Sequence, residues 1–72
     1  MRDLSEIGCL GVITVATRGI AGTGEVVVSV RGGSEAFLAW SDHPLSKGTQ
    51  IVVVDVRGPR TLQVAAAEEV GI

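Results

Sequence analysis

Residues 46–64 read SKGTQIVVVDVRGPRTLQV, and this stretch decides the fold. Residues 51–56 are rich in β-branched side chains, which are restricted at χ1 and suit a pleated strand better than a helix. Gly58 and Pro59 follow and predict a two-residue turn of type II′, in which Gly takes the positive φ of the first central position. Residues 60–64 then return antiparallel, so the stretch is predicted to form a β-hairpin.

Two strands joined by a tight turn are predicted before this hairpin. Residues 25–31 alternate, and their core face is predicted to carry Val26, Val28 and Val30. The pair Gly-Gly at residues 32–33 predicts a two-residue turn that leads into a strand at residues 35–41.

The first strand is predicted at residues 10–17 and leaves two assignments of its core face open. The inward set is either Val12, Thr14 and Ala16 or Ile13 and Val15. The second set is preferred because it buries more apolar area and no hydroxyl group.

The fourth strand does not alternate simply. Its two apolar pairs, Ile51 with Val53 and Val54 with Val56, lie on opposite faces of a regular strand. A β-bulge near residues 53–54 would turn all four inward and leave Asp55 and Arg57 in water. We therefore predict that bulge.

Five short strands bury their apolar faces without exposing sticky edges only if the sheet closes on itself. Residues 42–47 form an irregular crossing between the third and fourth strands, with Leu45 predicted to plug the barrel end. We predict an all-β fold, a small five-stranded OB-like closed β-barrel, and an SH3-like barrel also suits the order. One domain is expected over residues 1–72, with the barrel at about 8–66.

Composition restricts the classes of partner. The 72 residues are 46% hydrophobic and 19% charged, which argues against disorder, and the net charge of -2 gives no reason to expect binding to nucleic acid. Residues 10–16 are too short an apolar run to span a bilayer, so we expect this chain alone to be soluble and not to insert into membrane. Cys9 cannot form an internal disulfide and is predicted to be a small buried hydrophobe.

Six pieces of the chain follow one another in a characteristic order and spacing. They are Gly8-Cys-Leu-Gly11, Gly24-Glu-Val-Val-Val28, Phe37-Leu-Ala39, Leu45-Ser-Lys-Gly48, Ile51-Val-Val-Val54-Asp-Val56 and Leu62-Gln-Val64. Together, over residues 8–66, they resemble the soluble domain of the NfeD family, although no single piece is chemically specific. The resemblance implies an OB-fold barrel that is usually attached to transmembrane helices.

The resemblance also implies a function. It implies a non-catalytic scaffold or interaction domain that acts with membrane-organising partners of the stomatin, prohibitin and flotillin type, because the family's protease activity belongs to a separate domain. It implies a membrane-associated parent protein with the barrel in an aqueous compartment, by expectation the cytoplasm. Two features depart from the family pattern: residues 21–24 replace a frequent Pro-Gly turn, and no membrane helix is present in the sequence.

The motifs that could carry chemistry have the wrong spacing. The glycines of residues 19–24 precede a valine strand instead of the helix that a dinucleotide site requires, and in residues 46–48 the Lys precedes the Gly, unlike in a P-loop. One His and one Cys cannot form a zinc site within one chain. We expect no cofactor and no metal.

No catalytic arrangement is expected either. Ser41, Asp42 and His43 are the residue types of a hydrolytic triad, but neighbours in a turn cannot form the relay. Glu68 and Glu69 are adjacent, so their side chains diverge, and we expect a solvated acidic tail. The chain is therefore not expected to be an enzyme.

Leu38 and Trp40 are the candidate site. If Phe37 and Ala39 point into the barrel, Leu38 and Trp40 form an exposed apolar pair that could contact a protein partner or, weakly, a second copy. The alternative is that Trp40 lies partly buried under residues 42–47. The alternative function is an oligonucleotide- or oligosaccharide-binding OB module. The chain has six basic and eight acidic residues, and this excess of acidic residues argues against binding to a nucleic-acid backbone.

Overall fold

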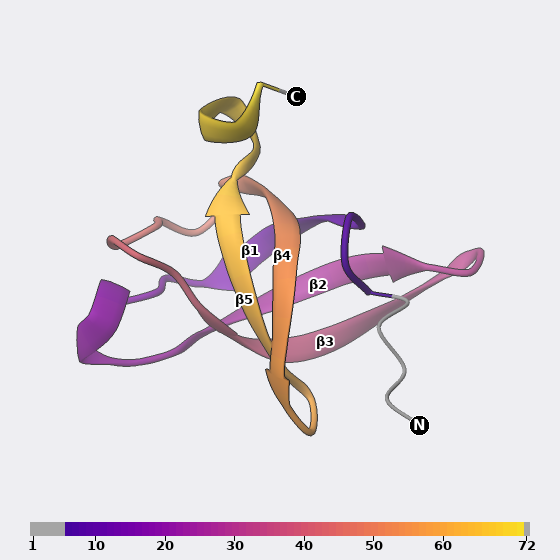
Figure 1. Cartoon of the computed structure of the whole chain (residues 1–72), viewed down its shortest axis with the longest axis horizontal. Coiled ribbons are helices and arrows are strands. Elements are labelled where there is room, and N and C mark those ends of the chain that lie inside the picture. Colours follow the sequence, from indigo (N-terminus) through magenta and orange to yellow (C-terminus); the bar gives the residue numbers. More distant parts are fainter. Residues whose placement is uncertain (1–5, 72) are drawn as a thin grey trace.

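The computed structural model describes residues 6–71 as five strands and two short 3-10 helices (Figure 1). The elements are β1 (Leu10–Val15), η1 (Gly19–Ala21), β2 (Gly24–Val30), β3 (Gly33–Trp40), β4 (Gln50–Gly58), β5 (Thr61–Ala66) and η2 (Ala67–Val70). In Figure 1, η2 and the β4–β5 turn lie at opposite ends of the β4–β5 hairpin.

The strands form a closed barrel in the order β1-β2-β3-β5-β4. Neighbouring strands pair antiparallel, except that β3 and β5 run parallel. This order is of the Greek-key kind found in OB-type barrels. The prediction of an all-β, five-stranded closed barrel is confirmed.

The core is built from alternate residues of every strand and from the crossing between β3 and β4. It contains Ile13, Val26, Val28, Phe37, Ala39, Leu45, Ile51, Val53, Leu62, Val64 and Ala66. The predicted core face of β2 is confirmed, with Val30 partly buried at its end, and Leu45 packs into the core as predicted. Cys9 is partly buried and packs against the same cluster.

The predicted core face of β1 is half right. Ile13 is buried, whereas Val15 is exposed, and the strand ends there instead of at residue 17. The register of β1 against β2 shifts between Ile13 and Val15. Such an irregularity bends the strand and breaks its alternation, which turns Val15 to solvent.

The predicted bulge in β4 is confirmed, with one difference. The pairing of β4 with β5 shifts register between Val53 and Asp55, so Val54 is the extra residue. Val54 faces solvent and not the core, because the extra residue of a bulge is left out of the ladder. Val56 packs against the core from a partly buried position, and Asp55 and Arg57 are exposed as predicted.

Both hairpin turns lie one residue away from their predicted positions. Val30 pairs with Gly33, so the first turn is Arg31-Gly32, and both residues have positive φ, as a type I′ turn requires. Gly58 pairs with Thr61, so the second turn is Pro59-Arg60. Arg60 has φ 51°, the left-handed position that follows Pro in a type II turn, and the predicted type II′ turn is wrong.

Arg31 is a poor residue for its turn. It takes φ 47° without being Gly or Asn, and its side chain is exposed. We expect Arg31→Asn to raise the free energy of unfolding by about 0.5–1 kcal/mol, because Asn-Gly is the preferred type I′ pair. Urea denaturation measures the change, with Arg31→Lys as an unchanged control. A lower midpoint for Arg31→Asn than for Arg31→Lys would contradict the turn assignment.

Candidate interaction surface

Leu38 and Trp40 point away from the core on β3, because Phe37 and Ala39 on the same strand are buried. Leu38 is 50% exposed and Trp40 is half-buried. The β3–β5 contact that closes the barrel runs through residues 38–40. The two residues of the predicted contact pair therefore share the outer face at the seam of the barrel.

Trp40 is partly covered by a charged side chain of β4. The guanidinium carbon of Arg57 lies 5.1 Å from the centroid of the Trp40 ring. Arg57 Nη1 also donates a hydrogen bond of 3.2 Å to Gln63 Oε1, and Gln63 is the β5 partner of Trp40. A guanidinium over an indole is attracted by the negative face of the ring, so Arg57 is held in place beside Trp40.

Ile20 belongs to the same surface, and the sequence reading missed it. It lies in η1 and is 88% exposed, more than any other large apolar residue that the structure describes. Together with Trp40 and Arg57 it lines a groove of about 260 Å³. The sequence gives no local signal that Ile20 is exposed. Its place beside Trp40 depends on the tertiary structure, which brings η1 next to the end of β3.

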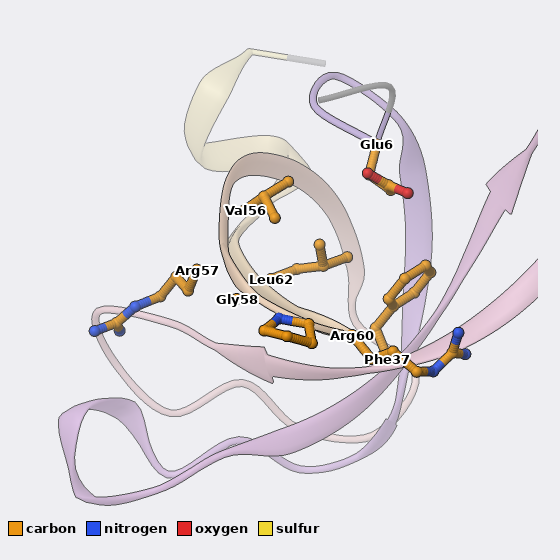
Figure 2. A pocket seen from close by; sticks show the side chains of 8 residues that line it. Glu6, Phe37, Val56, Arg57, Gly58, Arg60 and Leu62 are labelled. Carbon is orange, nitrogen blue, oxygen red and sulfur yellow. The ribbon is translucent and has the colours of Figure 1, made fainter. Parts of the chain in front are cut away.

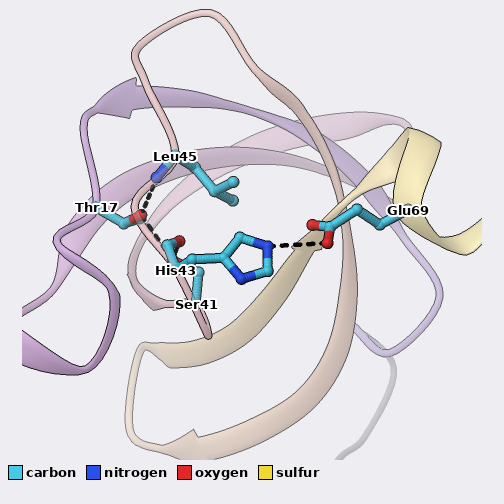
Figure 3. Close-up of polar contacts among 5 residues, drawn as sticks. All are labelled: Thr17, Ser41, His43, Leu45 and Glu69. Carbon is cyan, nitrogen blue, oxygen red and sulfur yellow. Dashed lines mark hydrogen bonds and ion pairs between the residues drawn. The ribbon is translucent and has the colours of Figure 1, made fainter.

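A buried hydrogen-bond relay joins Thr17, which lies between β1 and η1, to the crossing (Figure 3). Thr17 Oγ1 and Ser41 Oγ are 2.6 Å apart, and the Leu45 N–H donates to Thr17 Oγ1 at 2.8 Å. Ser41 Oγ donates to the carbonyl oxygen of His43 at 2.8 Å. The Ser41 hydroxyl is thus buried and committed to the backbone, and it is not paired with the His43 ring as a catalytic serine would be.

A comparison of the sequence with protein families identifies the chain. The model for the NfeD C-terminal domain matches residues 10–65, which is most of the chain. The chain belongs to the NfeD C-terminal domain family. This NfeD domain is also similar to the solution structure of the soluble domain of the NfeD protein YuaF from Bacillus subtilis, with 35% identity and a TM-score of 0.70. The similarity covers 85% of this chain and 73% of that chain, and no curated protein matches.

His43 and Glu69 tie the crossing of this NfeD domain to η2. His43 Nε2 and Glu69 Oε2 are 2.8 Å apart, and both side chains remain substantially exposed (Figure 3). Glu68 and Glu69 are both exposed, as expected of a solvated acidic tail, and Glu69 in addition pairs with His43. Exposed contacts of this kind contribute only about 0–1 kcal/mol, so this hydrogen bond adds little to the stability of the barrel.

The side chains around the β4–β5 turn surround a hollow (Figure 2). A pocket of about 590 Å³ there has Phe37, Val56 and Leu62 among its lining residues. Arg57 and Arg60 extend away from each other on opposite sides of the hollow in Figure 2. Arg60 covers Phe37 at 5.1 Å and donates to the Ala36 carbonyl at 2.6 Å, so its guanidinium is largely occupied by the barrel's own rim.

Residues 6–71 of the NfeD domain carry neither a cluster of metal ligands nor a helix that could cross a membrane. Among these residues, no group of three or more His, Cys, Asp and Glu side chains is placed to hold a metal ion. None of the helical segments within them is long and apolar enough to cross a bilayer.

Proposed function

We propose that this NfeD domain is a non-catalytic protein-interaction barrel. It serves as a scaffold in the cytoplasmic part of a membrane-associated NfeD protein, and its partner is a membrane-organising protein of the stomatin, prohibitin or flotillin type. The observation that supports this proposal most is the outward pair Leu38 and Trp40 at the seam of the barrel. Large apolar side chains that face solvent from a strand are available for burial against another protein.

The chemistry of the two residues suits a contact. Tryptophan is over-represented among the residues that contribute most to binding between proteins, because it buries a large area with little loss of side-chain freedom. Leu38 lies two residues away on the same face and widens the apolar area. Arg57 beside Trp40 adds a polar rim.

The proposal that the domain is non-catalytic is supported by the hydrogen bonds that its polar side chains make. Thr17 and Ser41 are buried and bond to each other and to the backbone. His43 pairs with the exposed Glu69 and not with a hydroxyl group. Thr17, Ser41 and His43 therefore hold the crossing in place. Their hydrogen bonds do not join a nucleophile to a general base.

A binding measurement tests the proposal by comparing substitutions of Leu38 and Leu10, two leucines that are equally exposed. We expect titration calorimetry with a purified stomatin-type protein to give a dissociation constant that Leu38→Gln and Trp40→Ala each raise about tenfold or more. Leu10 on β1 is also 50% exposed, so Leu10→Gln is the matched control and should leave the constant within about twofold. Circular dichroism verifies that each variant is folded.

Three outcomes would contradict the proposal. One is that no stomatin-, prohibitin- or flotillin-type protein binds. Another is that Leu10→Gln weakens binding as much as Leu38→Gln does. The third is tight binding of single-stranded oligonucleotides that falls steeply with added salt, which is the behaviour of a nucleic-acid-binding OB module.

A further inference from the structure

The groove between Ile20 and Trp40, called here the Ile20–Trp40 groove, is lined by Ile20, Trp40, Ser41, Asp42, Arg57 and Gln63. Trp40 is contributed by β3, Ile20 by η1 and Arg57 by β4. Three separate segments of the chain thus place two large apolar side chains and one cation around a single hollow.

The exposure of Ile20 is built into the fold. Gly19 is buried with φ 63°, and a side chain there would lie 3.2 Å from His43 Cα and 3.3 Å from Pro44 Cδ. The Thr17 N–H donates to the Leu45 carbonyl at 2.9 Å, which anchors the chain that leads into η1. The turn is therefore packed against the crossing on one side, and Ile20 is held out in water on the other.

The two sides of the groove are held together by the buried relay. Thr17 Oγ1 and Ser41 Oγ, 2.6 Å apart, join the residue three before Ile20 to the residue directly after Trp40. A groove whose sides are already fixed loses little conformational entropy when it is filled. Ile20 and Trp40 are thus preorganised to hold one apolar side chain between them.

Arg57 gives the groove a preference for charge. Its guanidinium has five N–H donors, and the side-chain contacts described above use its face for Trp40 and Nη1 for Gln63. The outer edge of an exposed guanidinium is suited to a carboxylate, which it can bind through two parallel hydrogen bonds. Asp42 is the other charge of the groove, two residues after Trp40, and it disfavours an occupant with carboxylates on both sides.

We propose that the Ile20–Trp40 groove binds a short segment of a partner protein that presents one carboxylate beside a large apolar side chain. The apolar side chain packs between Ile20 and Trp40, and the carboxylate pairs with Arg57. The inference rests on the proposed function, in that it takes a protein as the partner, and it adds the chemistry by which that partner is recognised.

Selection from a phage-displayed random peptide library tests this recognition. The wild-type domain should enrich peptides in which Asp or Glu neighbours Leu, Ile, Phe or Trp. Arg57→Glu should reverse the charge and enrich Lys or Arg beside the same apolar residues. Arg31→Glu makes the same change of charge on an exposed arginine at the β2–β3 turn and should select as the wild type does.

Affinity for the best acidic peptide completes the test. Trp40 is the only tryptophan, so its fluorescence reports occupancy of the groove. We expect Arg57→Glu and Ile20→Ser each to raise the dissociation constant about tenfold, and Arg31→Glu to leave it unchanged. Thermal denaturation shows whether the variants are folded as the wild type is.

The outcomes separate this inference from the proposed function. Failure of the wild type to enrich acidic and apolar peptides, an Arg57→Glu variant that selects the same peptides, or self-association that occupies the groove would overturn the inference. If a stomatin-type protein binds and Arg57→Glu does not weaken it, the groove is wrong and the proposed function stands. If acidic peptides bind as described and no stomatin-type protein does, the groove stands and the type of partner is wrong.

Discussion

Gly24→Ala is expected to remove about 3 kcal/mol or more from the free energy of unfolding, which is most of the stability of a domain of this size. A Cβ atom at Gly24 would overlap the carbonyl oxygen of Val15 and lie 2.6 Å from that of Ala16. Both obstacles are backbone atoms, which cannot rotate away as a side chain can. The bulge after Ile13 brings this part of the chain close to the start of β2, so relief would require β1 and β2 to separate.

Urea denaturation followed by Trp40 fluorescence measures the effect. Gly33→Ala is the matched control, because Gly33 also begins a strand and the nearest atom to its added Cβ, the Val30 carbonyl oxygen, is 3.8 Å away. We expect Gly33→Ala to change the free energy of unfolding by less than about 0.5 kcal/mol. Equal unfolding midpoints for the two variants would show that the close approach at Gly24 does not exist.

Thr17→Val is expected to lower the free energy of unfolding by about 2–3 kcal/mol although it preserves the shape of the side chain. Thr17 is buried, and its hydroxyl accepts the Leu45 N–H and bonds to Ser41. Valine would leave the Leu45 amide without this acceptor and would remove one of the two hydrogen bonds of Ser41, whose bond to the His43 carbonyl remains. Buried polar groups that lose their partners destabilise the fold by their full cost of desolvation.

Thr17→Ser distinguishes the contribution of the Thr17 hydroxyl to stability from that of its methyl group. Serine keeps the hydrogen bonds and loses one methyl group, so we expect a loss of about 1 kcal/mol. Thermal denaturation of both variants at the same pH gives the comparison. A serine variant as unstable as the valine variant would mean that packing, and not the relay, makes Thr17 important.

Regular alternation was read correctly from the sequence wherever a strand is regular. Val26 and Val28 of β2 lie in the core as their spacing indicates, and Val30 packs against it. The outward placement of Leu38 and Trp40 follows from the same rule once Phe37 is inside. A period of two depends only on the local backbone, and therefore it is visible in the chain itself.

Irregular positions were not read correctly. Val15 and Val54 both face solvent because a bulge interrupts the ladder next to them, and the residue at which a bulge occurs depends on how two strands match across the sheet. The β2–β3 turn was predicted at the Gly-Gly pair of residues 32–33, because glycine adopts a left-handed conformation easily. The turn instead places Arg31 in that conformation. Pairing across the sheet outweighed the local preference there.

The sequence by itself determined the class of fold, because the alternating valines and the positions of the glycines are properties of short segments. It also determined that Leu38 and Trp40 share one face of β3, whereas the structure decided that this face is the outer one. Only the tertiary structure decided that Ile20, Trp40 and Arg57 line one groove and that Thr17 bonds to Ser41 across 24 positions of sequence. Those contacts are set by the closure of the barrel, which brings distant segments together through packing that no local pattern encodes.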